Sequence, residues 1–362
     1  MDAVIALYGK GDDETARAII TSLGRRVFDD HPPRPSNIIR RGLGLFAFRL
    51  MERTTHTHTR TGPDGHPVVF YSNKILENSG HPYVSTLLEP SRADTSFFVE
   101  GGDPMNALYM MLVPEIRANA CKWDHIMLDS VQARDCQWRF VWETRMTHAL
   151  AARRLKVGEP VRLKAAAAGT GLSMIVVLDR LLSEGHDPGL ITAVITDREG
   201  ANVEKALRLL EKMPATHPHI ALHANAPSGI FLHVEDLLHP TTKTKHETPF
   251  DVLTLVGLLE YFPGFTFTTT EEHLGLPEPE GPPSAADLVR NIGAMTAEGG
   301  FLVVNTFRLK SAIRTMEVFG KRFRYRRREE MQELLAAGGF YTTGQCVSAN
   351  IFDVEIYAKM RA

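Results

Sequence analysis

The sequence predicts an α/β protein in which a Rossmann-like, mostly parallel sheet follows a mixed, partly helical N-terminal region. Residues 161–200 contain an apolar run, a glycine turn, a helix pattern and a second apolar run that ends on an acid. From there the strand and helix patterns alternate, as a parallel sheet covered on both faces requires. The earlier residues lack this alternation. We therefore expect an N-terminal accessory region at 1–130 and a sheet domain at 131–362, joined by a helix at 131–155.

The N-terminal region contains one clear hairpin signal. Residues 54–60 and 68–71 flank the turn sequence Gly-Pro-Asp-Gly. His56 and His58 alternate in the first of these strand patterns, so both lie on one face and could chelate a metal. The sequence shows no third ligand, and we expect no metal site here.

The joining helix carries two tryptophans, Trp138 and Trp142, four residues apart. This spacing places both on one helix face. We expect them to form an apolar seam between the N-terminal region and the sheet, with a lining role in a substrate pocket as the alternative.

The glycine turn is the most informative segment. Gly169 and Gly171 follow the first strand of the sheet domain, and such residues let the main chain turn sharply and approach a ligand. Asp197 ends the next strand, where a carboxylate would accept both hydroxyls of a ribose. The pattern predicts a nucleoside site. A packing turn that binds nothing is the alternative.

The third position of the glycine pattern separates two cofactor classes. A dinucleotide turn needs G-x-G-x-x-G so that the helix N-terminus meets the pyrophosphate. Met174 occupies that third position here. An NAD-type cofactor is therefore disfavoured, and the looser pattern fits S-adenosylmethionine, which has no pyrophosphate.

The remaining sheet domain alternates helices and strands up to two closing strands that suit an antiparallel hairpin. A long Pro/Gly-rich loop interrupts the alternation, and Gly299 and Gly300 predict a turn before the fifth strand. The expected helices are 173–182, 201–213, 284–297 and 328–337; the expected strands are 190–196, 230–234, 250–256, 301–305, 341–347 and 351–358; the loop is 263–283.

Composition excludes several classes of partner. Lys and Arg number 41 and Asp and Glu 43, for a net charge of −2, without a long basic block that could follow a phosphate backbone. We interpret the basic cluster at 321–328 as a solvent-exposed face that leads into a helix. The alternative is that Tyr325 or Arg326 faces an acidic substrate. We expect no nucleic-acid partner and no membrane insertion. Three scattered cysteines and the absence of a leader pattern favour the cytoplasm.

The later motifs suggest a family. The glycine turn, Asp197, Glu235 with Asp236, GLLEYF and EGGFLVVNTF together resemble class I S-adenosylmethionine-dependent methyltransferases over about residues 150–362. The resemblance implies a seven-stranded sheet whose last strand, FDVEIYAKM, is reversed. It also implies S-adenosyl-L-methionine as the cofactor.

By position, the resemblance also implies a set of cofactor-binding residues. Ala167, Gly169, Thr170 and Gly171 would form the cofactor turn, and Asp197 with Arg198 would bind the ribose. Glu235, Asp236 and Leu237 would contact the adenine, and Gly257 to Leu259 would line the floor of the cofactor site. Capping of a helix that begins at Leu237 is an equal alternative for Glu235 and Asp236.

Two positions depart from the family pattern. Ala165 stands where the family has an acidic residue in the first strand, and Ala167 stands where a glycine opens the turn. The missing acid normally lies near the ammonium of the cofactor's methionine end. Arg139 and Glu260 are the candidates to reshape that end of the site.

Methyl transfer needs few catalytic groups, because the donor is already activated and the enzyme mainly aligns the reactants. Glu260 and Tyr261 follow the fourth strand, at the crevice where such sheets place ligands. Glu260, or a histidine such as His125 or His223, could take a proton from a hydroxyl or amine acceptor. Tyr261 could equally be a core aromatic.

The leading hypothesis is an S-adenosylmethionine-dependent methyltransferase that acts on a small molecule by in-line transfer. One alternative, prompted by the missing strand acid, is an aminocarboxypropyl transferase or cyclase that releases methylthioadenosine. Another is a non-catalytic binding module with the same fold. A homodimer is compatible with the sequence.

Overall fold

The computed structural model describes most of residues 131–362 and part of the N-terminal region. The described residues are 13–30, 53–54, 56–61, 67–72, 109, 112–114, 117, 131–213, 215, 220–222, 228–238, 248–261, 284–307, 325–349 and 351–361. The predicted loop at 263–283, His125, His223 and residues 321–324 of the basic cluster lie outside them.

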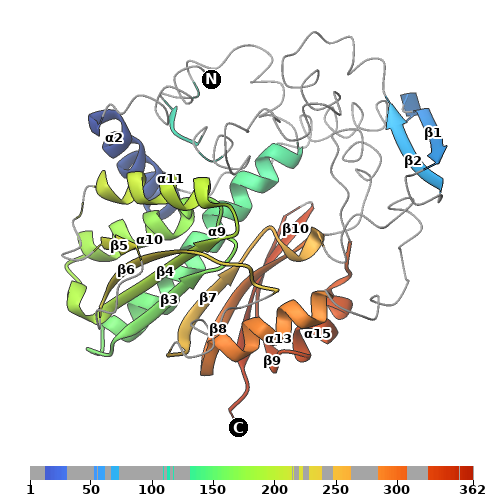
Figure 1. The fold of residues 1–362 in the computed structure, drawn as a ribbon. Helices are drawn as coiled ribbons and strands as arrows, with labels where there is room; N and C mark the ends of the chain where they lie inside the picture. The colour runs from blue at the N-terminus through green and yellow to red at the C-terminus, as the bar shows by residue number, and fades with distance from the viewer. Residues whose placement is uncertain are drawn as a thin grey trace.

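Within the described residues, eight strands form one sheet in the order β5-β6-β4-β3-β7-β8-β10-β9 (Figure 1). Their bounds are Val161–Ala165 (β3), Ile191–Asp197 (β4), Ile220–Leu222 (β5), Gly229–Val234 (β6), Phe250–Leu255 (β7), Thr296–Phe307 (β8), Phe340–Ser348 (β9) and Phe352–Lys359 (β10). Only β10 is reversed, because it pairs antiparallel with both neighbours. The seven strands and the reversed last strand are confirmed, and the sequence prediction missed only the short edge strand β5.

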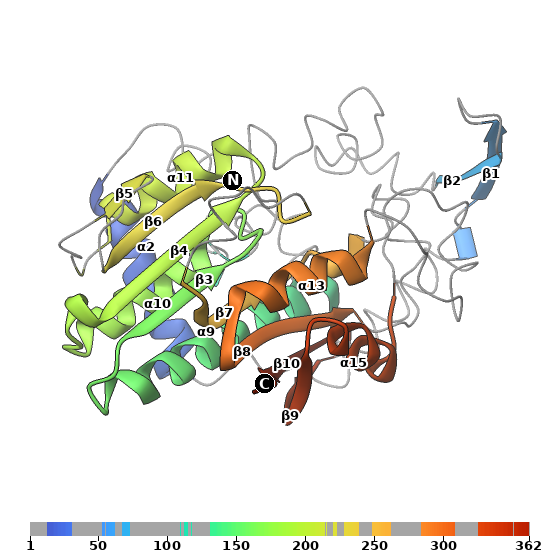
Figure 2. The same ribbon diagram turned by 60° about the horizontal axis from the view of Figure 1, so that its bottom comes forward.

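Helices cover both faces of the sheet (Figure 2). One core cluster joins α9 (Val131–Leu155), α10 (Leu172–Ser183) and α11 (Gly200–Glu211) to inward residues such as Leu163 and Ile195. A second cluster joins α13 (Ala285–Met295) and α15 (Arg328–Ala336) to Leu253. Strands buried on both faces are mainly apolar, as the central runs of the sequence are, and Lys164 of β3 is a buried exception. No helix in the described part of the chain is both long and apolar enough to cross a membrane.

Parts of the N-terminal region pack on the α9 side of the sheet. Ile20 and Leu23 of α2 (Asp13–Gly24) and Val27 of the following turn η1 (Arg25–Asp29) are fully buried in the first cluster. Tyr109 and Leu112 join the same cluster. Trp138 lies in this cluster as well, and its ring centroid is 6.0 Å from that of Trp142, which packs against it.

Two predicted local features can be compared with the structure. Strands β1 (His56–Thr61) and β2 (Pro67–Ser72) pair antiparallel, which confirms the hairpin. The turn predicted at Gly299 and Gly300 is instead a bulge inside β8, which begins directly after α13. Gly299 has a φ of 71°, so the chain bends there without leaving the sheet.

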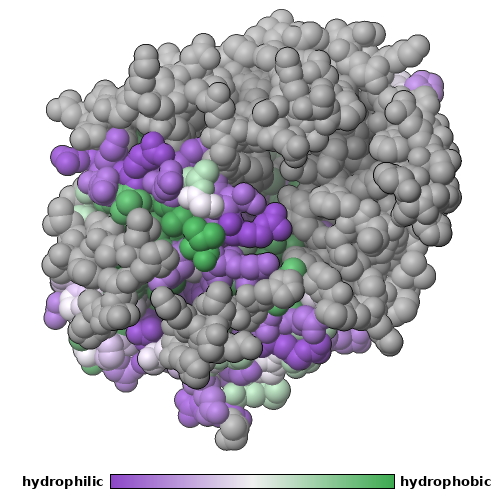
Figure 3. Space-filling view, viewed as in Figure 1, coloured by the Kyte–Doolittle hydropathy of each residue, from purple (hydrophilic) through white to green (hydrophobic). Residues whose placement is uncertain are grey.

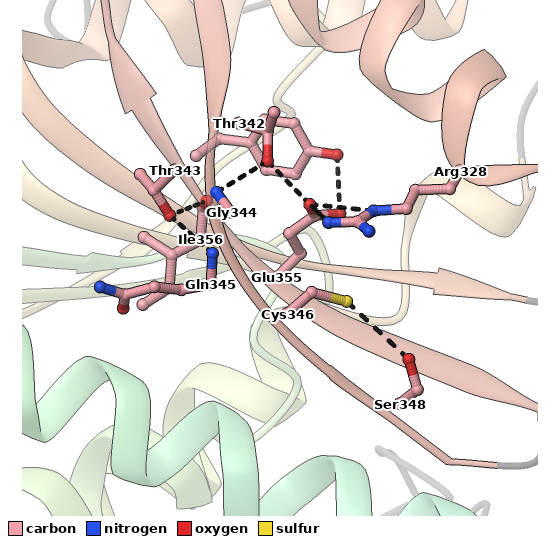
Figure 4. Close-up of polar contacts among 10 residues, drawn as sticks. Arg328, Thr342, Thr343, Gly344, Gln345, Cys346, Ser348, Glu355 and Ile356 are labelled. Carbon is pink, nitrogen blue, oxygen red and sulfur yellow. Dashed lines mark hydrogen bonds and ion pairs between the residues drawn. The ribbon is translucent and has the colours of Figure 1, made fainter.

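A buried carboxylate connects the reversed strand β10 to its neighbouring elements (Figure 4). Glu355 of β10 is fully buried and accepts hydrogen bonds from Arg328 of α15, Thr342 of β9 and the Tyr357 hydroxyl, at 2.6, 2.9 and 2.9 Å. Burial and the Glu355 charge raise the pKa of Tyr357, so its hydroxyl keeps the proton that it donates. These contacts join α15 and β9 to β10 and satisfy a charge that would be costly to bury alone.

Candidate functional site

The glycine turn connects β3 to α10 in left-handed backbone conformations. Ala167, Gly169 and Gly171 have φ angles of 49°, 57° and 66°. A Cβ on Gly171 would lie 2.6 Å from Cγ2 of Ile195, so only glycine fits there. Ala167 adopts a left-handed conformation although it has a side chain, which explains why the related pattern places a glycine at this point.

Asp197 lies directly against this turn. Its Oδ2 accepts a hydrogen bond from the Gly169 N–H at 2.8 Å. Its Oδ1 accepts from the Glu199 N–H at 2.9 Å and from the Asn202 side chain at 3.0 Å. The structure therefore brings together the carboxylate and the bare main chain that the sequence predicted as neighbours. Arg198 beside them is exposed and lies 3.3 Å from Glu199.

The end of β6 separates the two predicted adenine-side acids. Glu235 is buried, and its carboxylate oxygens lie 2.8 and 3.1 Å from Nζ of Lys164. Lys164 is fully buried in β3, where its ammonium also lies 5.2 Å from the centroid of the Phe250 ring. The Glu235 carboxylate therefore balances a buried lysine, a partner that the sequence interpretation did not consider.

Asp236 remains at the surface. It is exposed, and its Oδ1 accepts from the Leu238 N–H at 3.0 Å. Leu237 is buried and begins a turn at this point, where the alternative interpretation expected a helix. The side chain of Val234 next to them is 57% exposed. Figure 3 shows hydrophobic and hydrophilic residues meeting on this face, near α11 and the end of β6.

The end of β7 lies on the other side of β3 from β4. Gly257 has a φ of 82°, and its N–H donates to Oδ1 of Asn305 at 2.7 Å. A Cβ on Gly257 would lie 3.6 Å from both terminal nitrogens of Arg139. Leu258 is half-buried beside it, and Leu259 begins the short turn η4 (Leu259–Tyr261).

The basic cluster contributes a buried residue to this end of the site. Arg326 is 2% exposed and donates to the Leu259 carbonyl at 2.6 Å, and Tyr325 packs against Phe307. Arg327 is exposed. The prediction of a solvated face was therefore wrong for Tyr325 and Arg326, because these two residues turn into the core just before α15.

Arg139 and Glu260 form a buried pair next to Gly257. The side chains are each 5% exposed, and Nη1 of Arg139 lies 3.6 Å from Oε1 of Glu260. Nη2 of Arg139 donates to the Tyr109 hydroxyl at 2.8 Å, and its guanidinium lies 4.8 Å from the centroid of the Phe352 ring. Glu260, a predicted site residue, therefore lies buried next to Arg139 just beyond the end of β7. The side chain of Tyr261 lies outside the described residues.

The titration of this pair follows from its burial. Burial raises the pKa of Glu260, and the nearby Arg139 only partly opposes that rise. Burial disfavours the charge of Arg139, but the Tyr109, Cys136 and Glu260 side chains outweigh it and raise the pKa, so the guanidinium stays charged. Burial also raises the pKa of Cys136 to about 12, which makes this thiol a poor nucleophile.

A second buried acid, which lies on α9, contacts the first turn of α10. Glu143 is buried and accepts a hydrogen bond from the Ser173 hydroxyl, in the first turn of α10, at 2.8 Å. Arg139 and Glu143 are four residues apart and therefore share a helix face. The sequence interpretation missed Tyr109, Asn305 and Glu143. Only Asn305 carried a signal, as a polar residue near the end of an apolar strand.

The two histidines of the hairpin both belong to its first strand. His56 and His58 lie two residues apart in β1, and the side chain of His58 is outside the described residues. In the part of the chain that the structure describes, no three His, Cys, Asp or Glu side chains are grouped as metal ligands.

The comparisons with known proteins give information on the fold alone. No family model matches the sequence, and no curated protein matches it. The chain is structurally similar to a possible exported protein from Bordetella parapertussis, at 14% identity and a TM-score of 0.52 over 97% of this chain and 100% of that one.

Two further similar structures are methyltransferases. Magnesium protoporphyrin IX methyltransferase from Synechocystis PCC 6803, with bound SAH, is 11% identical over 62% of this chain and 86% of its own, with a TM-score of 0.39. The N-methyltransferase NodS from Bradyrhizobium japonicum WM9, in complex with S-adenosyl-L-homocysteine, is 14% identical over 60% and 87%, with a TM-score of 0.37. With its strand order and its one reversed strand, this chain has the Rossmann-like fold of class I methyltransferases.

Proposed function

We propose that this protein is an S-adenosyl-L-methionine-dependent methyltransferase that acts on a small molecule. The observation that carries the proposal is the 2.8 Å hydrogen bond from the Gly169 N–H to Asp197. It joins a turn of bare main chain to a carboxylate at the carboxyl ends of two neighbouring strands, where open α/β sheets bind ligands.

The residues at this crevice fit an adenosine-bearing cofactor. Asp197 would bind the ribose, with Arg198 beside it, and the exposed Asp236 and Val234 would border the adenine with Leu237. We reassign Glu235 to a supporting role, because Lys164 occupies its carboxylate. The remaining contacts would come from the main chain of the turn and of the β7 end: Ala167, Gly169, Thr170, Gly171, Gly257 and Leu258.

Bound S-adenosylmethionine supplies an electrophilic methyl group on a sulfonium. The protein's own task is to hold the acceptor atom in line with that methyl group and to exclude water. Glu260 is the candidate for the proton that a hydroxyl or amine acceptor loses. Its burial raises its pKa, which makes it a better proton acceptor than an exposed glutamate.

A small acceptor suits the charge of the molecule and of the site. The net charge of −2 does not favour binding to a nucleic-acid backbone. The polar side chains at the end of β7, Arg139 and Glu260, are each 5% exposed. Such a buried pair suits a compact ligand that is enclosed by the protein.

The test has two stages. Calorimetric titration with S-adenosylhomocysteine should show binding, and incubation with methyl-labelled S-adenosylmethionine and a metabolite extract should then move label into a small product. Label found only in protein or RNA would exclude the small-molecule acceptor. Failure of the folded protein to bind S-adenosylhomocysteine at millimolar concentration would contradict the cofactor assignment and favour the non-catalytic binding module.

One observation supports a second candidate. Ala165 is fully buried at the end of β3, where the related pattern has an acid near the methionine end of the cofactor. A different methionine end could expose another carbon of the sulfonium to attack, as in an aminocarboxypropyl transferase or cyclase. Mass spectrometry separates the candidates, because methyl transfer releases S-adenosylhomocysteine and the second reaction releases methylthioadenosine.

A further inference from the structure

A buried ion pair connects two strands that are not neighbours in the sheet. Lys164 of β3 is fully buried, and its Nζ lies 2.8 and 3.1 Å from the two carboxylate oxygens of Glu235, directly after β6. Strand β4 lies between β3 and β6, so the lysine side chain reaches across it (Figure 2). The same ammonium lies 3.3 Å from the Met295 sulfur and 5.2 Å from the centroid of the Phe250 ring. Lys164 therefore faces the protein interior and not a ligand.

Stability alone does not explain a charged pair at this place. Phe250 and Met295, which contact the lysine, belong to an apolar core cluster. Taking two charges out of water is costly, and apolar residues of similar volume often give equal or greater stability. What the pair adds to an apolar contact is direction, because two short contacts to one ammonium hold the Glu235 carboxylate at a defined place. We therefore looked for a part of the molecule whose position depends on Glu235.

The short turn that begins at Glu235 is held at both ends. The Glu235 N–H donates to the Asp197 carbonyl at 3.0 Å, and its carboxylate is held by the buried pair. Two residues further on, the Leu237 carbonyl accepts from the side chain of Asn291 in α13 at 2.8 Å. Asp236 lies between these two anchors and is exposed. The buried pair thus fixes one end of a turn that presents an acid at the surface.

The same turn relates the two acids of the proposed cofactor site. Asp197 is the residue proposed for the ribose, and Asp236 borders the proposed position of the adenine. Glu235 is bonded through its main chain to Asp197 and precedes Asp236, so its position sets where one acid lies relative to the other. A carboxylate only accepts hydrogen bonds. An acid fixed beside the base therefore favours an amino group over a carbonyl oxygen at the facing position.

We propose that Lys164 is a positioning residue, which holds Asp236 in place through Glu235 so that the site selects a 6-amino purine over a 6-oxo purine. The inference rests on the proposed function and deepens it. Lys164 touches neither the cofactor nor the acceptor, and its effect passes through the turn at 235–238. It gives the first strand a role in the choice of base that its distance from the base would not suggest.

The test compares S-adenosylhomocysteine with S-inosylhomocysteine, which carries a 6-oxo group in place of the 6-amino group. Calorimetry on the wild-type chain should show about 10- to 100-fold tighter binding of the first ligand, the range of one hydrogen bond to a charged group. Lys164→Met with Glu235→Gln removes both buried charges and keeps similar side-chain volumes, so the protein should stay folded. This double variant should reduce the preference to a few-fold.

Glu355→Gln is the matched control. Glu355 is likewise a fully buried carboxylate that pairs with a cation, Arg328, but it belongs to β10, on the other side of the sheet from β6. Glu355→Gln should lower the free energy of unfolding without changing the ratio of the two dissociation constants. A purely structural role of Lys164 would weaken both ligands equally, so this ratio separates positioning from packing.

Amide hydrogen exchange examines the turn without any ligand. The Leu238 N–H donates to Oδ1 of Asp236 at 3.0 Å, so its exchange rate reports whether the turn keeps its conformation. Exchange at Leu238 should be several-fold faster in the double variant than in wild type. It should be unchanged in Glu355→Gln.

The possible outcomes separate this proposal from the proposed function. If the double variant keeps the wild-type preference, or if exchange at Leu238 stays the same, the positioning role is overturned while the cofactor site stands. If wild type binds both ligands equally well, Asp236 does not select the amino group, and this proposal again fails alone. If wild type binds neither ligand, the proposed function fails and the positioning role fails with it.

Discussion

The two sides of β3 differ in how completely their polar groups are satisfied. On the β4 side, both oxygens of Asp197 already accept hydrogen bonds, and Gly171 packs too closely on Ile195 for any side chain. On the β7 side, Arg139 and Glu260 are buried 3.6 Å apart, and the Nε of Arg139 has no partner among the described residues. We call the β4 side the frame, because its carboxylate is already hydrogen-bonded and its turn is closely packed. The β7 side has the incomplete polar contacts expected where a ligand binds.

The contrast has a physical reason. A ribose hydroxyl can share a carboxylate that is already hydrogen-bonded, because each carboxylate oxygen accepts more than one hydrogen bond. Arg139 and Glu260 are instead buried 3.6 Å apart, and burying charges that are not fully compensated costs stability. Changes on the β4 side should therefore alter both folding and binding, and a change at Glu260 on the β7 side should alter the pH dependence of folding.

The largest expected effect is on the frame itself. Gly171→Ala should lower the free energy of unfolding by about 2 to 5 kcal/mol, from the left-handed backbone and the contact with Ile195 together. Gly158→Ala is the control, because its φ is similar at 76° but nothing lies within 4 Å of the added Cβ. It should cost only about 1 to 2 kcal/mol. Equal losses in urea denaturation would show that the contact with Ile195 is unimportant.

A smaller effect is expected at the carboxylate of the frame. Asp197→Asn replaces one acceptor oxygen with a donor that faces other donors, so it should cost about 1 to 3 kcal/mol of stability. Calorimetry should show at least about 10-fold weaker binding of S-adenosylhomocysteine. Asp187→Asn keeps the oxygen that accepts from the Gly189 N–H and serves as the control. An Asp197→Asn protein that binds like this control would remove the ribose contact from the proposal.

The smallest expected effect is a pH dependence on the β7 side. Burial raises the pKa of Glu260 in the folded protein above its value in the unfolded chain. Between the two values the folded state holds more protons, so the free energy of unfolding falls as pH rises through this window. The contribution is fully present below the unfolded pKa. Glu260→Gln should remove this slope in urea denaturation series from pH 4 to 8, and parallel profiles for the two proteins would contradict the expectation.

The local half of the site could be predicted from the sequence. Gly169, Gly171 and Asp197 lie within one β-α-β unit, and the topology of such units brings a turn and the next strand end together. Arg139 contacts Gly257 across 118 positions of the chain, and no periodicity reports such a contact. Tyr109 comes from a region without strand and helix alternation. The sequence could only suggest Arg139, from the acid that is missing at Ala165.

The sequence contains a signal that could have corrected the interpretation of Glu235 as an adenine-binding residue. Lys164 is a lysine in the middle of a strand that is otherwise buried on both faces. A lysine there needs a carboxylate partner inside the protein. Glu235 is at the end of β6, within reach of that lysine and next to the exposed Asp236. The partner of a buried charge should be identified before neighbouring acids are assigned to a ligand.

The placement of β10 between β8 and β9 has a consequence for biosynthesis. The ribosome releases β9 first, yet β9 has no strand partner among the described residues until β10 has been inserted between it and β8. Until then the nascent chain exposes the open edge of β8, whose free amides and carbonyls invite pairing with other chains. Chaperone protection should therefore matter most during translation of the final strand.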